Sequence, residues 1–532
     1  MSNREQLIYG PKDESGIPKE SMGKFYFDLL RKRNPNDVAY IDAFTEEKLT
    51  CGNLLEKSKK VSIFFYNMHI NKDDVIGIYL KNDINYIIPI LSCLYIGAIA
   101  NLISANYKDR ELKHVLSTTR PKLVICEEDN FEKIIKFKQD FQCLHHIFIY
   151  KSANNQSNGF SSIEDALKDI TEKETKEFLP IDVTDCRNQC GLIFQSSGTT
   201  GLPKPVLLNH ENIRSLAVQM KQRINLEHGE VTLLYFPMCH MYGFILHTTI
   251  LVHSLTGIVM NHFQPKKFLE TIQRYKPRLL FVVSQILNFL ATSDLISQYS
   301  LTSIQDVVSS ASFVGINLIN KLRMNIRQMY GLTETSGPIT FQLLPNNKKA
   351  TIGKVATGCV AKVYCAETNQ SLGPNLVGEL CFKGASIMKG YYRNEIETKK
   401  TIDDDGFLHT GDLGYYDEEQ NFYIIDREKE TIKYKAYQVS PSEIEELLLT
   451  HPDIKDCGVV GKKHELFEQV AMAFVVLQNN ASSSDEEIIK FVSDNLSVQK
   501  HLHGGVKFVQ EIPRTESGKI ARYELKELLN NI

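Results

Sequence analysis

Strand-like apolar runs and helix-periodic segments alternate along the first part of the chain, and this alternation restricts the folds that it can adopt. Two apolar runs, residues 75–80 and 123–126, predict buried strands. Residues 53–67, 85–98 and 109–118 instead repeat apolar side chains at helical spacing. Strands that alternate with helices usually form a parallel sheet covered by helices, so we expect an α/β fold.

Two later regions extend this prediction. Residues 206–308 repeat the alternation, with strand-like runs at 232–237, 257–260 and 279–283. From about residue 350 to 425, short segments rich in glycine and aromatic residues predict a smaller β-rich subdomain, and the remaining residues return to mixed α and β patterns. A chain of 532 residues is long enough for about two to four domain-sized units.

A glycine- and hydroxyl-rich loop follows the apolar run at residues 190–194, which predicts a short buried strand. The loop, residues 195–204, reads Gln-Ser-Ser-Gly-Thr-Thr-Gly-Leu-Pro-Lys. Its glycines let backbone N–H groups turn toward one point, its hydroxyls add donors and its lysine adds a full charge, which suits a bound phosphate. The lysine spacing and the following Pro205 differ from the ordinary P-loop. A flexible polar surface loop is the alternative interpretation.

Three further stretches carry candidate binding groups. Thr333 and Glu334 bring a hydroxyl and a carboxylate together after an apolar segment, a pair that suits a phosphate and its magnesium. Asp412 lies in a glycine-bounded turn where a carboxylate can accept from both ribose hydroxyls, although the same pattern is typical of an Asx turn between strands. Lys519 follows a glycine turn and precedes an amphipathic run, where a solvated lysine at a helix start is the simpler interpretation.

Composition and charge exclude several classes of partner. The formal net charge of -3, with lysine and glutamate interleaved, gives no field that would recruit nucleic acid or an anionic membrane. The 11 cysteines form no CxxC pair, so we expect reduced thiols in a reducing compartment. The polar N-terminus lacks an apolar secretion segment, residues 86–103 are too short and mixed for a membrane span, and the last residues differ from a Ser-Lys-Leu peroxisomal signal. We expect a cytoplasmic protein without integral membrane association.

Together these stretches resemble the adenylate-forming superfamily, which includes acyl-CoA synthetases, beetle-type luciferases and peptide-synthetase adenylation domains. The characteristic strings occur in the family's order over nearly the whole chain. Residues 8–11, 378–381, 406–412 and 432–439 are most similar to the luciferase and coumarate-CoA ligase branch. Within that branch the chain resembles insect luciferase-like acyl-CoA synthetases.

The resemblance implies two domains and a two-step reaction. A large N-terminal domain would span residues 1–425, and a small mobile α+β lid would span residues 426–532, with the hinge at Asp426. Members of the superfamily use ATP and Mg²⁺ to convert a carboxylic acid to an acyl-adenylate, rotate the lid, and pass the acyl group to coenzyme A. We therefore expect a small-molecule carboxylic acid as substrate, and the sequence makes no prediction of oligomeric state.

The resemblance also assigns roles to individual residues. Lys519 matches the lysine that the lid delivers to the α-phosphate, Lys435 lies in the segment that the rotated lid brings to the acyl-adenylate, and Glu334 matches the magnesium carboxylate. Asp412 and Arg427 match the ribose-binding pair. The implied ATP-binding residues are Ser196, Ser197, Gly198, Thr199, Thr200, Gly201, Lys204, Tyr330, Gly331, Thr333, Asp412 and Arg427.

The acid-binding side of the site is implied by four residues. His240 matches a histidine between the carboxylate pocket and the coenzyme A channel, although on its sequence alone it is more typical of a core residue. The implied substrate-pocket residues are His240, Tyr242, Ser310 and Ala311.

Several positions depart from the family pattern. Pro205 replaces the usual glycine after the loop lysine, which removes one N–H and favours extended backbone at Lys204. Residues 310–313 read Ser-Ala-Ser-Phe where the family has Gly-Gly-Ala-Pro at the acyl-pocket wall. Ala436 replaces a glycine beside the pantetheine tunnel, where an added methyl group would narrow the passage. The sequence therefore supports adenylation more strongly than thioester formation.

Three function classes remain open on the sequence. The first is an ATP-dependent acyl-CoA ligase for a fatty or aromatic acid, which the His-Met-Tyr-Gly string at residues 240–243 favours. The second is a luciferase-type monooxygenase that makes the same kind of adenylate and oxidises it with O2. The third is a non-catalytic nucleotide-binding relative. The third class is opposed by the joint presence of Thr333, Glu334, Asp412, Lys435 and Lys519.

Overall fold

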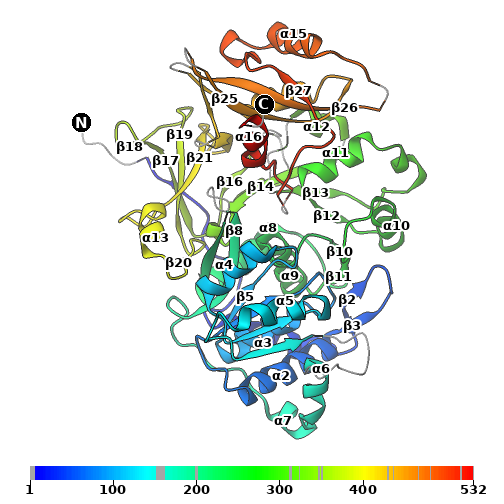
Figure 1. The fold of residues 1–532 in the computed structure, drawn as a ribbon. Coiled ribbons are helices and arrows are strands. Elements are labelled where there is room, and N and C mark those ends of the chain that lie inside the picture. The colour runs from blue at the N-terminus through cyan, green and yellow to red at the C-terminus, as the bar shows by residue number, and fades with distance from the viewer. Residues whose placement is uncertain are drawn as a thin grey trace.

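The residues that the computed structural model describes fold into five β-sheets with helices packed around them (Figure 1). The structure describes residues 6–150, 162–197, 202–310, 314, 316–322, 324–344, 348, 351–427, 430–434, 437–464, 467–479, 481–515 and 518–530. Four sheets contain the strands up to residue 427, and the fifth sheet contains the strands from residue 432 onward.

The largest sheet has seven strands in the order β20-β9-β8-β5-β4-β6-β7. Its strands are β4 (Val75–Tyr79), β5 (Ile99–Leu102), β6 (Leu123–Cys126), β7 (His146–Ile149), β8 (Cys190–Ser197), β9 (Pro203–Asn209) and β20 (Gly390–Tyr391). The central strand β4 is parallel to both neighbours and is buried along its whole length, as a strand covered on both faces must be. Strand β8 extends to Ser197 and β9 begins at Pro203, so both ends of the predicted glycine-rich loop belong to this sheet.

Two further sheets of the first 355 residues complete the helix-covered part of the molecule. One has the order β10-β11-β2-β3, with β2 (Val38–Asp42), β3 (Lys48–Thr50), β10 (Val231–Leu234) and β11 (Thr256–Val259). The other has the order β12-β13-β14-β15-β16, with β12 (Leu279–Val282), β13 (Asp306–Ser309), β14 (Ile326–Leu332), β15 (Gly337–Phe341) and β16 (Lys354–Val355). These two sheets pack with the largest one around a common apolar core.

Helices cover these sheets and connect their parallel strands. They are α1 (Met22–Lys32), α2 (Cys51–Asn67), α3 (Ile87–Ile96), α4 (Asp109–Thr119), α5 (Glu128–Lys138), α6 (Ile163–Ala166), α7 (Glu172–Glu177), α8 (His210–Arg223), α9 (Met241–His253), α10 (Pro265–Tyr275), α11 (Ser284–Thr292) and α12 (Ile316–Leu322). Short 3₁₀ turns are η1 (Leu167–Asp169), η2 (Asp294–Gln298) and η3 (Thr333–Thr335). In α2 the Thr50 hydroxyl caps the helix by accepting from the Asn53 N–H, and α3 ends at Gly97 with φ of 71°.

The β-rich subdomain is an antiparallel sheet in the order β1-β17-β19-β21-β22, with β18 paired to β17. Its elements are β1 (Ile8–Tyr9), β17 (Cys359–Cys365), β18 (Gln370–Ser371), β19 (Gly378–Gly384), α13 (Glu395–Thr401), β21 (Leu408–Tyr416) and β22 (Phe422–Arg427). The edge strand β1 comes from the N-terminus, and the Gly10 N–H donates to the Cys359 carbonyl over 2.8 Å. This sheet therefore joins segments about 350 residues apart in sequence.

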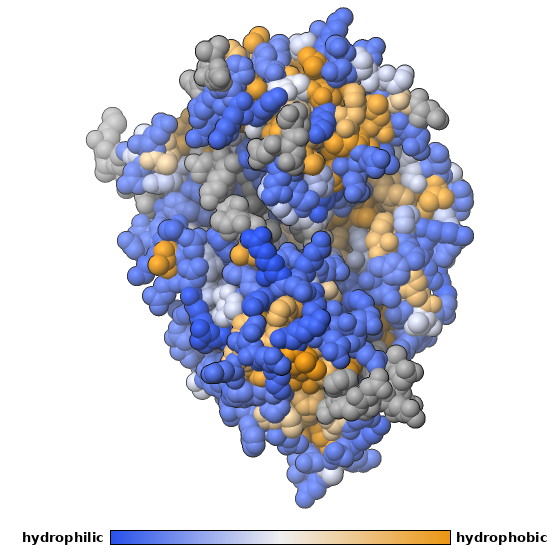
Figure 2. Space-filling model, viewed as in Figure 1, coloured by the Kyte–Doolittle hydropathy of each residue, from blue (hydrophilic) through white to orange (hydrophobic). Residues whose placement is uncertain are grey.

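The C-terminal domain forms the top of the molecule in Figure 1 and has its own apolar cores. It contains β23 (Ile432–Tyr434), β24 (Tyr437–Val439), α14 (Pro441–Leu448), β25 (Ile454–His464), β26 (Glu468–Leu477), α15 (Asp485–Asn495), η4 (Val498–Lys500), β27 (Val506–Phe508) and α16 (Arg522–Asn530). Figure 2 shows a largely hydrophilic outer face that is hollowed between this domain and the rest of the molecule.

The α/β fold class predicted from the sequence is confirmed, and most of the predicted strands agree with the structure within one or two residues. The apolar runs at 123–126, 257–260 and 279–283 correspond to β6, β11 and β12. In the described parts of the chain, no helix combines the length and apolarity that crossing a membrane requires.

Candidate active site

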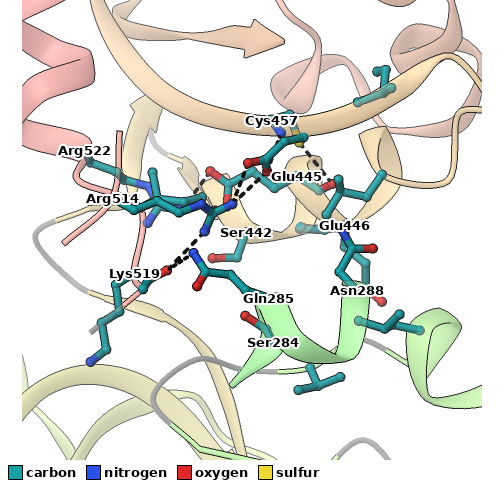
Figure 3. Close-up of a pocket in the computed structure, with 18 of the residues that line it drawn as sticks. Ser284, Gln285, Asn288, Ser442, Glu445, Glu446, Cys457, Arg514, Lys519 and Arg522 are labelled. Carbon is teal, nitrogen blue, oxygen red and sulfur yellow. Dashed lines mark hydrogen bonds and ion pairs between the residues drawn. The ribbon is translucent and has the colours of Figure 1, made fainter. Parts of the chain in front are cut away.

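A cavity of about 1860 Å³ lies between the C-terminal domain and the larger part of the molecule (Figure 3). The larger part contributes Tyr330, Gly331 and Asp412 to its lining, and the C-terminal domain contributes Gly518 and Lys519. Residues that the sequence predicted to bind adenine and ribose therefore share one cavity with the predicted lid lysine. The cavity is large enough to hold a nucleotide together with a second small molecule.

Asp412 is buried in the middle of β21, so the glycine-bounded turn predicted from the sequence is part of a strand. The Tyr330 hydroxyl, from β14, donates to Asp412 Oδ2 over 2.6 Å, and the Asp412 N–H donates to the Thr410 hydroxyl over 3.1 Å. Gly411 has φ of 69°, a conformation that favours glycine. A side chain at Gly331 would lie 2.1 Å from the Gly337 carbonyl oxygen, so Tyr330 is followed by a position that only glycine fits.

Lys519 follows a tight turn that contacts α11 of the larger part. The Gly518 N–H donates to the Thr515 carbonyl and the Thr515 N–H donates to the Lys519 carbonyl, each over 2.8 Å, which closes the turn. The Gln285 amide donates to the Gly518 carbonyl over 3.0 Å and thus links the two parts of the molecule. In Figure 3 the Lys519 side chain extends away from Arg514 and toward the larger part.

The predicted loop lysine and the predicted magnesium carboxylate both contact Tyr391, a residue that sequence reasoning missed. The Tyr391 hydroxyl donates to Glu334 Oε1 over 3.0 Å, and Lys204 Nζ lies 5.3 Å from the centre of the Tyr391 ring. Lys204 also forms an ion pair of 2.9 Å with Glu397, which α13 presents. Burial, and then the Glu334 charge, raise the pKa of Tyr391, whereas ion pairs with Lys400 and Lys204 lower the pKa of Glu397 to about 2.

These contacts test whether the region suits a phosphate-bound magnesium ion. Glu334 offers a half-buried carboxylate that accepts from the Tyr391 hydroxyl, and Thr333, the preceding residue of η3, carries a hydroxyl oxygen. Oxygen donors of this kind are those that Mg²⁺ prefers. The residues present therefore fit the ion.

Pro205 lies in β9 and is compatible with the sheet. Its carbonyl accepts from the Tyr392 N–H over 2.8 Å, and it is opposite Gln195 in the β8–β9 pair. The backbones of Ser196 and Lys204 are likewise opposite each other, so the two ends of the glycine-rich loop are held together. The predicted extended backbone at Lys204 agrees with this strand.

Tyr242 and Ser310 meet at the end of β12. The Tyr242 hydroxyl donates to the Val282 carbonyl over 2.9 Å, and the Ser310 N–H donates to the same carbonyl over 3.2 Å. Tyr242 also stacks on Phe236 at 4.3 Å, and burial raises its pKa. His240 is half-buried at the start of α9, where its carbonyl accepts from the Phe244 N–H, and it is not among the described residues that line the cavity.

Several predicted positions lie outside the described residues, namely Gly198, Thr199, Thr200, Gly201, Ala311, Lys435 and Ala436. For Ser197 and Arg427 the structure describes the strands but not the side chains. The Arg427 backbone is opposite Asp412 in the β21–β22 pair.

Comparison with known proteins identifies the family. Residues 28–392 match the AMP-binding enzyme family, and residues 443–519 match the AMP-binding enzyme C-terminal domain. The chain belongs to the AMP-binding enzymes, as the resemblance to the adenylate-forming superfamily predicted.

Relatives and solved structures cover nearly the whole chain. It is 33% identical to luciferin 4-monooxygenase of Nipponoluciola cruciata over 99% of this chain and 98% of the relative. It is 32% identical to probable 4-coumarate–CoA ligase 3 of Dictyostelium discoideum, over 97% of this chain and 96% of the relative. The fold is similar to that of ATP-bound MatB from Rhodopseudomonas palustris, with a TM-score of 0.87 and 22% identity over 96% of this chain and 99% of that one.

Proposed function

We propose that this protein is an acyl-CoA synthetase, which activates a fatty or aromatic carboxylic acid with ATP and then transfers the acyl group to coenzyme A. The observation that carries the proposal is the shared cavity, which is lined by Lys519 from the C-terminal domain and by Asp412 and Tyr330 from the larger part. An adenylation reaction requires nucleotide-binding groups and a cation in one cavity.

In the first step, an oxygen of the substrate carboxylate attacks the α-phosphorus of ATP and pyrophosphate leaves. Both reactants are anionic, so fixed positive charge is needed where charge develops on the phosphorus. We assign this role to Lys519. The Asp412 carboxylate would accept from the ribose hydroxyls together with Arg427, and Tyr330 and Gly331 would border the adenine.

The triphosphate would lie along the loop that joins β8 to β9. Ser196 to Lys204 would donate to the β- and γ-phosphates, and Thr333 would add a hydroxyl. Glu334, oriented by Tyr391, would hold Mg²⁺, which supplies charge neutralisation between phosphate oxygens when it is bound. Lys204 would exchange Glu397 for phosphate as its ionic partner.

In the second step, the coenzyme A thiol attacks the acyl carbon and AMP leaves. We propose that the C-terminal domain, residues 426–532, rotates about Asp426 between the steps and brings Lys435 to the adenylate. His240 would stand between the acid pocket, with Tyr242, Ser310 and Ala311, and the coenzyme A channel. All 11 cysteines are free thiols, which supports the cytoplasm as the location.

Mass spectrometry of the products from ATP, coenzyme A and a panel of carboxylic acids tests this proposal. Formation of an acyl-CoA together with AMP and pyrophosphate is the expected result. Release of ADP and phosphate, or no reaction with any acid while ATP binds, would contradict it.

A luciferase-type monooxygenase is the second candidate, and the 33% identity to luciferin 4-monooxygenase supports it. Such an enzyme would form the adenylate and consume it with O2, with emission of light. Luciferin is therefore one member of the acid panel, with oxygen uptake and photon counting as additional measurements. Oxygen-dependent consumption of the adenylate without thioester formation would favour this candidate over the ligase.

A further inference from the structure

The ring of His409 lies between two carboxylates in the β-rich subdomain. His409 Nδ1 is 2.6 Å from Glu379 Oε2, and His409 Nε2 is 3.4 Å from Asp403 Oδ2. An imidazolium donates from both nitrogens, whereas a neutral imidazole donates from only one. Protonated His409 therefore matches both carboxylates, and neutral His409 turns a lone pair toward one of them.

The remaining neighbours of His409 keep this arrangement in place. On β17, Lys362 lies 3.4 Å from the far carboxylate, Asp403, and the Tyr364 ring meets the histidine ring edge-on at 5.2 Å. On β19, Cys381 Sγ lies 3.5 Å from His409 Nδ1, and burial raises the pKa of this thiol. Hydrogen bonds thus account for the close approach of Glu379, Cys381 and His409.

Glu379 uses its second oxygen to hold the backbone beside Asp412. Its Oε1 accepts from the Gly411 N–H over 2.8 Å. The Thr410 hydroxyl donates to the Leu380 carbonyl over 2.7 Å and accepts from the Asp412 N–H. One carboxylate therefore connects His409 to the β21 backbone beside Asp412, which lines the cavity.

We propose that Glu379 and His409 are positioning residues for the segment of β21 that carries Asp412, and that loss of the His409 proton weakens the hydrogen bonds between Asp412 and the ribose hydroxyls. This inference rests on the proposed nucleotide site, but it assigns a function to two residues outside the cavity. It also makes nucleotide recognition sensitive to protons at a group that does not touch the nucleotide.

The direction of the pH dependence follows from the contacts. The hydrogen bond to Glu379 raises the pKa of His409 despite partial burial. The ion pair between His409 and Glu379 is therefore fully present below the unfolded pKa of His409, about 6.5, and it is lost as the pH rises through the higher folded pKa. Ribose recognition should weaken on the alkaline side of neutrality.

Calorimetric binding of AMP and of 2′,3′-dideoxyAMP at several pH values tests the proposal. The ratio of the two dissociation constants isolates the ribose hydroxyls, because phosphate titration affects both nucleotides equally. In the wild-type protein, the preference for AMP should fall roughly three- to tenfold between about pH 6 and pH 8.5. In His409→Gln and Glu379→Gln, the preference should be weak and independent of pH.

The control is His228→Gln, which removes an exposed imidazole that also contacts a carboxylate, that of Asp37, which precedes β2. This variant should keep the wild-type pH profile, and thermal melting checks that all variants are folded. Identical pH profiles in wild type, His409→Gln and Glu379→Gln would overturn the inference and leave the nucleotide site intact. A wild-type protein that binds neither nucleotide would overturn the proposed function as well.

Discussion

The proposed role of Lys519 requires the preceding turn as well as the lysine charge. Gly518, with φ of 85°, sets the direction of the backbone at that turn. A side chain at Gly518 would also lie 2.7 Å from the Gln285 amide oxygen. At the scale of single residues, the site therefore combines a charged group with a backbone conformation that only glycine adopts readily.

Lys519→Ala should slow adenylate formation about a thousandfold. A lysine charge about 4 Å from phosphate, at an effective dielectric constant near 20, contributes about 4 kcal/mol. ATP–pyrophosphate exchange measures the rate, and Lys490→Ala is a matched control because Lys490 is an exposed lysine of the same domain. Near-normal exchange in the Lys519 variant would refute its catalytic role.

Asp412→Ala and Glu334→Ala should differ in the kinetic constant that they change. Loss of the ribose acceptor should raise the KM for ATP roughly ten- to a hundredfold, the range expected for hydrogen bonds to a charged group. Loss of Glu334 should mainly lower kcat and alter the magnesium dependence, and Tyr391→Phe should show a weaker form of the same change. Steady-state kinetics at varied ATP and Mg²⁺ make the comparison, and equal effects of the two alanine variants would contradict this division of roles.

At the scale of elements, the first turn of α11 holds the C-terminal domain through Gln285. Gln285→Ala should slow adenylation about three- to tenfold, because one hydrogen bond to the Lys519 turn is lost. Conversion of preformed adenylate to acyl-CoA should be unchanged. Thr292→Ala is the control, since the Thr292 hydroxyl bonds within α11. A parallel loss in both half-reactions would show that Gln285 acts on the fold and not on the lid.

Long buried strands could be predicted from the sequence, but the shortest strands could not. The sequence segments that form β4 and β6 are continuous apolar runs because helices cover both faces of their sheet. The pairs that β1 and β20 make depend on partners far away in sequence, and two residues carry no periodic signal. The register of the strand pairs could not be predicted from the sequence either.

The candidate site was predictable where a motif carried its own chemistry. Asp412 was predicted in this way, whereas Lys519 was predicted only through the family resemblance, and both line the same cavity. Tyr391 and Glu397 were missed because their partners Glu334 and Lys204 lie 57 and 193 residues away. Contacts of this kind arise only when separate elements are packed together.

At the scale of the whole molecule, the two half-reactions should be separable, because each would use a different face of the C-terminal domain. Lys435→Ala should spare adenylate formation and slow its conversion to acyl-CoA. Ala436→Gly should leave adenylation unchanged and speed the second step if the methyl group obstructs the tunnel. Single-turnover assays with preformed adenylate measure both. Rapid transfer to coenzyme A in wild type, with no gain in Ala436→Gly, would dismiss the obstruction and strengthen the ligase proposal.

The N-terminal strand β1 completes the β-rich subdomain, with Ile8 buried against β17 and the Gly358 N–H bonded to the Pro11 carbonyl over 2.8 Å. Residues 350–425 alone therefore do not contain all the strands of this sheet. A chimaera that grafts this stretch into a relative would expose the open edge of β17 unless residues 8–11 were exchanged with it. In chimaeras of this chain, residues 8–11 and residues 350–425 must be exchanged together.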